Sequence, residues 1–148
     1  MGANEEEAVA ALLHDAVEDQ GGAARLADIG QRYGKRVAGI VADCSDCCTD
    51  DDGTELAWRA RKETYVASLA SKPRSSLLVS LADKTHNARA IVDDLAICGP
   101  EVWDRFTAGR AGTVWYYAAL AAAFEVYMPG PFAERLKRLA SVMAASDI

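Results

Sequence analysis

The sequence predicts an all-α protein, and three observations lead to that class. Apolar residues recur at helical spacing along most of the 148 residues, and glycine and proline stand mainly between these periodic segments. No stretch shows the sustained alternation of a strand. Hydrophobic residues make up 51% of the chain, which is enough for one core at this length. We therefore expect a single compact helical bundle over residues 1–148.

Glycines and prolines predict where the helices end. Gly21-Gly22 and Gly34 are suitable C-terminal stops. Pro73 precedes one long helix and Gly99-Pro100 ends it. The corner Pro129-Gly130-Pro131 leads into an amphipathic final helix. We expect helices near 4–19, 23–33, 35–45, 55–71, 75–97, 101–107, 110–128 and 131–145.

The segment ALLHDAVED, at residues 11–19, carries the first candidate chemistry. At 100° per residue its His14, Glu18, Asp15 and Asp19 fall at about 0°, 40°, 100° and 140°, while apolar residues take the opposite arc. One imidazole and three carboxylates on one face suit a divalent metal and a water to be activated. An amphipathic helix with a solvated acidic face explains the same pattern.

The segment LADKTHNAR, at residues 81–89, carries the second. Asp83 and Asn87 lie one helical turn apart beside an apolar stripe that includes Leu77 and Leu81. We expect both polar side chains to be partly buried, and buried polar groups need partners. A metal and a ligand would supply these, and so would a hydrogen-bonded pair within a helical core.

Together the two segments resemble the HD-domain phosphohydrolases, specifically those that hydrolyse the alarmones guanosine tetraphosphate and pentaphosphate. The resemblance continues through YGKRVAGIVADCSD and WRARKETYVASLA and covers most of the chain. It implies an HD-domain helical fold. It also implies Mn²⁺ or another divalent metal as cofactor, and cleavage at the 3′ position of the alarmone with release of pyrophosphate.

The resemblance also implies roles for individual residues. His14 and Asp15 match the family's central metal-binding pair, and Asp83 matches its last metal ligand. Glu18 and Asp19 match the pair that activates the attacking water. Substrate binding is implied for Asn87, for the basic run Arg59, Arg61 and Lys62, and for Tyr116 and Tyr117. Core packing is the alternative for the two tyrosines, and a solvated helix face for the three cations.

The beginning of the chain departs from the family pattern. The family's metal site starts with a further His on an upstream helix, whereas residues 1–13 contain no His. His86 is a poor substitute because it lies about 60° around its helix from Asp83. The chain resembles the family without its first helix, so we expect weaker metal binding. Uncovered apolar surface should favour a homo-oligomer.

Two functions therefore stay open. The intact Glu18-Asp19 pair favours an enzyme that acts on a phosphorylated guanosine nucleotide or a similar small molecule. The missing His favours a non-catalytic HD-fold protein that binds nucleotides or a partner.

Charge and hydropathy exclude other classes. A net charge of −6 argues against general nucleic-acid binding, because phosphate backbones are held mainly by clustered cations. No segment has the length and apolarity of a membrane span, and no secretory signal is visible. We expect a cytoplasmic protein without a membrane partner.

Four cysteines complete the inventory. Cys44, Cys47 and Cys48 form a CxxCC cluster beside an acidic run, and Cys98 stands alone. Zinc normally needs four well-placed ligands, and no second CxxC or paired His is present. We expect neither a zinc site nor a structural disulfide, and we expect a mobile loop over residues 44–53.

Overall fold

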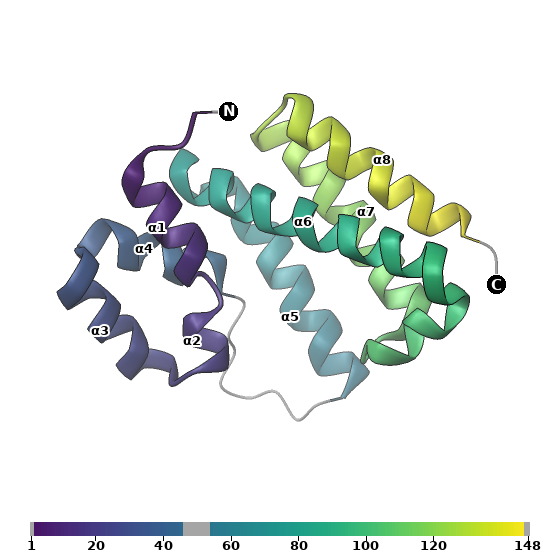
Figure 1. Cartoon of the computed structure of the whole chain (residues 1–148), viewed down its shortest axis with the longest axis horizontal. Coiled ribbons are helices and arrows are strands. Elements are labelled where there is room, and N and C mark those ends of the chain that lie inside the picture. The colour runs from purple at the N-terminus through teal and green to yellow at the C-terminus, as the bar shows by residue number, and fades with distance from the viewer. Residues whose placement is uncertain (1, 46–53, 147–148) are drawn as a thin grey trace. The chain divides into compact units, whose positions relative to one another are not determined.

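A computed structural model describes residues 2–45 and 54–146, and within these ranges all regular structure is helical (Figure 1). The all-α prediction is thereby confirmed. The elements are α1 (Glu5–Leu13), α2 (Ala16–Asp19), α3 (Gly22–Tyr33), α4 (Lys35–Cys44), α5 (Glu55–Ser68), the 3₁₀ helix η1 (Leu69–Ser71), α6 (Arg74–Cys98), the 3₁₀ helix η2 (Gly99–Arg105), α7 (Gly109–Tyr127) and α8 (Pro131–Ala145).

The described residues belong to two compact units. The first takes them from Met1–Cys47 and Ser71–Ser80, and the second from Cys48–Ala70 and Leu81–Ile148. His14 and Asp15 belong to the first unit, whereas Asp83 belongs to the second. Each unit has its own set of packed helices and is considered by itself.

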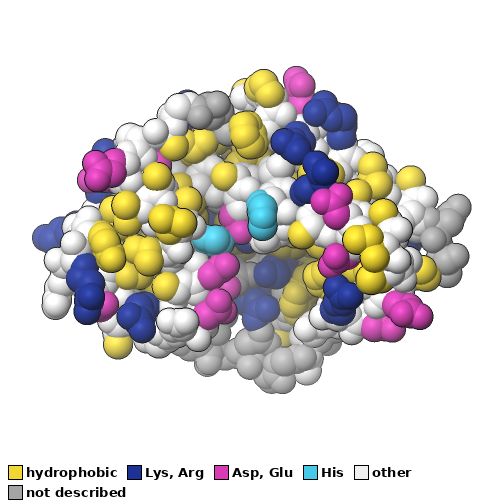
Figure 2. Space-filling view, viewed as in Figure 1, with side chains coloured by type: hydrophobic (Ala, Val, Ile, Leu, Met, Phe, Trp, Pro, Cys, Tyr) yellow, Lys and Arg dark blue, Asp and Glu magenta, His cyan; other side chains and the backbone are white. Residues whose placement is uncertain are grey.

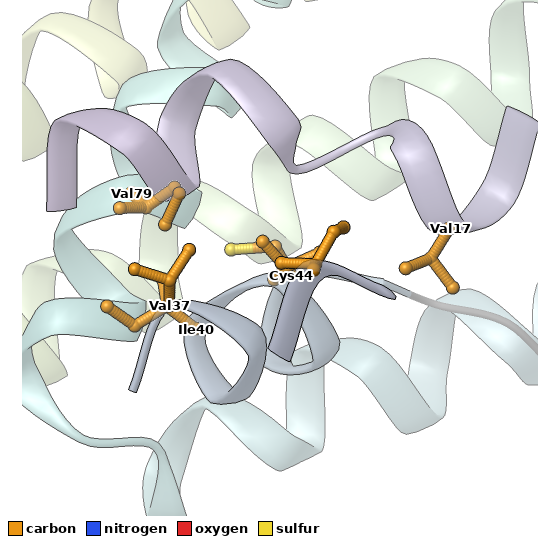
Figure 3. Close-up of a cluster of buried hydrophobic side chains, with 8 residues drawn as sticks. Val17, Val37, Ile40, Cys44 and Val79 are labelled. Carbon is orange, nitrogen blue, oxygen red and sulfur yellow. The ribbon is translucent and has the colours of Figure 1, made fainter. Parts of the chain in front are cut away.

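The first unit is built around a cluster of small and β-branched side chains. Helix α1 packs on α4, α2 packs on α3, and α3 packs on α4. Figure 3 shows Val17, Val37, Ile40, Cys44 and Val79 turned into this core. The buried members are Ala10, Val17, Ile29, Val37, Ile40, Val41, Cys44 and Val79. Side chains of this size let α1 and α2 approach α3 and α4 closely.

A polar network holds the start of α1 against the start of α6. Asn4 and Glu7 form a reciprocal capping box, with both backbone-to-side-chain distances at 2.9 Å. The buried Glu7 carboxylate also accepts a 2.7 Å hydrogen bond from Ser75 Oγ. Arg36 donates to Ser75 Oγ at 3.2 Å and pairs with Glu6 at 2.8 Å. This network fixes the helix that leads to His14.

Acidification is expected to weaken this network. The hydrogen bonds from Ser75 and from the Asn4 backbone lower the pKa of Glu7 below its ordinary value of 4.5. Because the folded-state pKa is the lower one, the stabilisation is present above the unfolded pKa and is lost as the pH falls through the folded pKa. Urea unfolding at about pH 6 and about pH 3.5 measures the effect. The wild type should lose more stability over that interval than Glu7→Gln, and equal losses would contradict this role.

The second unit is centred on α7, which packs against α5, α8 and η2. Its fully buried side chains include Leu120 and Phe124 on α7 and Leu136 and Met143 on α8. Gly130 has φ +142°, a conformation that favours glycine, and it turns the chain into Pro131 at the start of α8. The predicted corner between these two helices is thus confirmed.

The structure differs from the sequence-based expectations in one helix and also bears on those for the cysteines. The α-helix expected near 101–107 is instead the 3₁₀ helix η2, which Gly99 begins with φ +66°. Cys44 is buried at the end of α4 and Cys98 is exposed, and neither forms a disulfide. Cys47, Cys48 and the acidic run expected to be a mobile loop lie outside the described residues. Each helix in the described ranges is too short or too polar to cross a membrane.

Candidate functional site

The helix expected over residues 4–19 is interrupted at the His14-Asp15 pair. Helix α1 ends at Leu13 and α2 starts at Ala16, and Asp15 has φ −88° and ψ −8°. The angular placement expected for one continuous helix was therefore wrong. The pair instead forms the turn between two helices, with Glu18 and Asp19 on the second one.

His14 has a defined orientation in this turn. Its Nδ1 lies 2.6 Å from the carbonyl oxygen of Ala11, so Nδ1 is assigned as the donor. Its Nε2 lies 3.1 Å from Asp15 Oδ2. Ring orientation by a backbone carbonyl is typical of metal-binding histidines, because it leaves the other nitrogen for the ion.

Glu18 and Asp19 follow on α2 and are both exposed. Val17, between the turn and these residues, is buried in the core of the first unit. Burial of Val17 anchors the four-residue helix α2, on which Glu18 and Asp19 are exposed.

In the second unit, Asp83 is held by its own helix. Its side chain is only 8% exposed. Oδ1 accepts a 3.0 Å hydrogen bond from Asn87 Nδ2, and Oδ2 lies 2.9 Å from Lys84 Nζ. The expected pairing of Asp83 with Asn87 is confirmed, but the expected partial burial of Asn87 was wrong, because Asn87 is exposed. His86 is exposed as well, as a surface histidine should be.

Lys84 is the cation at the centre of this part of the second unit. Its side chain is 17% exposed, and its Nζ lies 5.3 Å from the ring centroid of Tyr65. Burial alone would lower the pKa of Lys84, but Tyr116, Tyr65 and Asp83 outweigh burial and raise it above the ordinary value. Burial likewise raises the pKa of Tyr117 to about 12, so its hydroxyl keeps its proton at neutral pH.

The residues proposed for substrate binding gather between α5 and α7. Tyr116 and Tyr117 are both buried, as expected for core aromatics. Lys62 Nζ lies 5.0 Å from the Tyr116 ring centroid, and Arg59 Cζ lies 3.3 Å from that of Trp115. Arg61 is half-buried on the same helix α5. The three cations thus share helix α5, and Figure 2 shows further Lys and Arg side chains on the visible face.

Comparison with known proteins shows the family of this chain. The family model of the HD domain matches residues 1–114. The chain belongs to the HD-domain family. It is also similar to the protein lmo0812 from Listeria monocytogenes EGD-e, known from a 1.85 Å crystal structure. The two are 30% identical, the match covers 95% of this chain and 88% of that chain, and the TM-score is 0.77. No curated protein matches the sequence.

The family assignment indicates a metal-dependent phosphohydrolase in general, because HD domains typically bind divalent metals. The His14-Asp15 turn fits such an ion in part. Adjacent ligands of one cation lie about 3.0–3.4 Å apart when each is about 2.1 Å from it, and His14 Nε2 and Asp15 Oδ2 are 3.1 Å apart. Among the described residues, no three His, Cys, Asp or Glu side chains within either unit form a metal-binding group.

Sequence reasoning missed two features of this HD domain. Lys84 stands inside the LADKTHNAR motif but received no role, although it is the residue that pairs with Asp83. Arg110 donates from Nη2 to the carbonyls of Ala144 and Ser146 at 2.9 and 3.1 Å, a contact that the sequence does not reveal. It therefore satisfies the end of α8, as a basic residue near a helix C-terminus can do.

The homo-oligomer stays a prediction. Leu12, on α1, is 86% exposed, and Figure 2 shows hydrophobic side chains gathered over α1 on the visible face. An exposed leucine of this kind is compatible with self-association but is also common on monomers.

Proposed function

We propose that this HD domain removes pyrophosphate from the 3′ position of guanosine tetraphosphate or pentaphosphate, or from a closely related nucleotide. The observation that carries the proposal is the His14-Asp15 turn, in which Nε2 faces Asp15 Oδ2 at 3.1 Å. The sequence around it, ALLHDAVED, and the later LADKTHNAR are the two segments that resemble the alarmone hydrolases.

His14, Asp15 and Asp83 would hold the divalent ion, Mn²⁺ in our proposal. The ion supplies Lewis acidity toward a phosphoryl group and makes water a stronger nucleophile at neutral pH. Asp83 can serve although Asn87 and Lys84 each engage one of its oxygens, because a carboxylate has about four lone-pair sites. These two neighbours would orient the carboxylate, as outer partners of metal ligands commonly do.

Glu18 and Asp19 would take up the proton that the attacking water loses. Both are exposed on α2, directly after the turn that carries the metal-binding pair. Ordinary carboxylates are ionised at neutral pH and can accept a proton. Substrate phosphates would be neutralised by Arg61 and Lys62, with Asn87, Tyr116 and Tyr117 as further contacts to the nucleotide.

A pyrophosphate-release assay tests the proposed function. The full chain with Mn²⁺ and guanosine tetraphosphate is expected to release pyrophosphate, and EDTA or Asp83→Ala is expected to abolish the release. His86→Ala is the matched control, since His86 is exposed on the same helix and should leave the rate unchanged. Absence of release by the wild type with Mn²⁺ would overturn the proposal.

A second function, nucleotide binding without catalysis, is favoured by one observation. Arg59 and Lys62 lie over aromatic rings of α7, an arrangement that suits nucleotide binding and needs no metal. A guanosine nucleotide that binds to the wild type with Mn²⁺ but is recovered intact after long incubation would support this second function against the first.

A further inference from the structure

Arg59 lies flat on the ring of Trp115. Its guanidinium carbon is 3.3 Å from the ring centroid. An edge-on guanidinium would place an N–H between the two groups and hold its carbon at about 4 Å or more. The two planar groups are therefore stacked in van der Waals contact, which is a geometry that arginine adopts and lysine cannot.

Arg59 stays partly exposed in this stack. Trp115 covers one face of the guanidinium, and Glu63 Oε1 accepts from Nε at 2.8 Å and so holds one edge. The Arg59 side chain is nevertheless 42% exposed. Part of the Arg59 side chain is therefore accessible to a ligand.

Neighbouring rings hold the stack in place. Trp58 meets Trp115 edge to face, with ring centroids 6.4 Å apart and an angle of 68° between the planes. It also meets Tyr116 at 6.0 Å and 74°. Gly112 makes room for it, since a Cβ at Gly112 would approach a Trp58 ring carbon to 3.3 Å. Edge-to-face packing of this kind fixes ring orientation, so the platform is preorganised.

Positive charge lies directly beside the stack. Lys62 Nζ is 5.0 Å from the Tyr116 ring centroid and 6.0 Å from that of Trp58. Lys84 is placed similarly over Tyr65, at 5.3 Å. Arg59 and Lys62, both on α5, thus place positive charge beside neighbouring rings, which suits a ligand with both a flat ring and phosphates.

We propose that the Arg59–Trp115 stack binds the base of the substrate nucleotide on the guanidinium face opposite Trp115. Arginine planes and aromatic rings stack nucleobases in many RNA-binding proteins. The inference rests on the proposed function in taking a nucleotide as the ligand. It goes further by assigning base recognition to two residues of α5 and α7 and by restricting substrates to phosphorylated compounds with a planar ring.

Calorimetric titration of the full chain in EDTA tests the proposal without turnover. The two probes are guanosine diphosphate, which carries a base, and inorganic pyrophosphate, which does not. Arg59→Leu and Trp115→Leu should weaken guanosine diphosphate binding about tenfold or more and leave pyrophosphate binding unchanged. Arg59→Lys should weaken guanosine diphosphate binding too, because lysine keeps the charge but lacks the flat guanidinium group. Trp115→Phe should retain part of the affinity.

Arg89→Leu is the matched control. Arg89 pairs with Asp93 at 2.9 Å in the same i,i+4 geometry by which Arg59 pairs with Glu63. Unchanged guanosine diphosphate binding by Arg59→Lys, or equal weakening of both probes by Arg59→Leu, would overturn the stacking role. Selective loss in EDTA combined with no pyrophosphate release in Mn²⁺ would keep this inference and overturn the proposed hydrolysis. If instead the wild type releases pyrophosphate and both leucine variants bind guanosine diphosphate fully, the proposed hydrolysis is kept and this inference is overturned.

Discussion

Replacing His14 by alanine is expected to weaken Mn²⁺ binding by more than about a hundredfold. Changes to the partners that merely orient metal ligands typically cost ten- to a hundredfold in affinity, and loss of a ligand itself should exceed that. His14 Nδ1 is held by the Ala11 carbonyl, so Nε2 is already oriented beside Asp15. Isothermal titration calorimetry of the full chain with Mn²⁺ measures the change.

The chain supplies its own control for this experiment. It has two histidines, and the second, His86, is exposed. Replacing His86 by alanine removes the same kind of side chain as His14→Ala does. His86→Ala should bind Mn²⁺ as the wild type does. Equal binding by wild type, His14→Ala and His86→Ala would remove His14 from the metal site.

Replacing Lys84 by methionine is expected to cost about 3–5 kcal/mol of unfolding free energy. Removing one member of a buried ion pair leaves the other charge without compensation, which costs about that much. Asp83 is 8% exposed, and Lys84 Nζ lies 2.9 Å from its Oδ2. Urea unfolding at neutral pH, with the transition followed by circular dichroism, measures the loss.

Two further variants separate the buried pair from a general effect of losing a lysine. Lys137→Met breaks the exposed 2.7 Å ion pair with Glu125 and should cost at most about 1 kcal/mol. Adding Asp83→Asn to Lys84→Met should recover much of the loss, because the uncompensated charge is then gone. If Lys84→Met and Lys137→Met cost the same, the Asp83–Lys84 pair is not a buried charge pair in energetic terms.

Most helices were predictable because their ends depend on local chemistry. Gly34, with φ +92°, separates α3 from α4 within one residue of the expected position, and Pro73 directly precedes α6. The break at His14-Asp15 was not predictable from periodicity, since every residue from Ala11 to Asp19 is compatible with a helix. The break coincides with a hydrogen bond from the His14 ring to the carbonyl of Ala11 in the preceding turn. Such competition between a side chain and the helix backbone cannot be detected from hydrophobic periodicity.

The site was predictable where it depends on spacing along one helix. Asp83 and Asn87, four residues apart, do form a hydrogen bond. The stack of Arg59 on Trp115 joins two helices whose register is set by packing, so no spacing rule links these residues. The aromatic run in α7 indicated core packing, and Tyr116 and Tyr117 are buried. The run did not indicate that cations would lie over its rings.

The turn between α1 and α2 has an electrostatic consequence. The last carbonyls of a helix carry a partial negative charge and favour a cation, whereas the first amides of the next carry a partial positive charge and favour anions. His14 and Asp15 directly follow the end of α1, and Glu18 and Asp19 lie in the first turn of α2. The end of α1 thereby favours positive charge beside the proposed metal ligands. A single straight helix through this segment would not place a helix end beside His14 and Asp15.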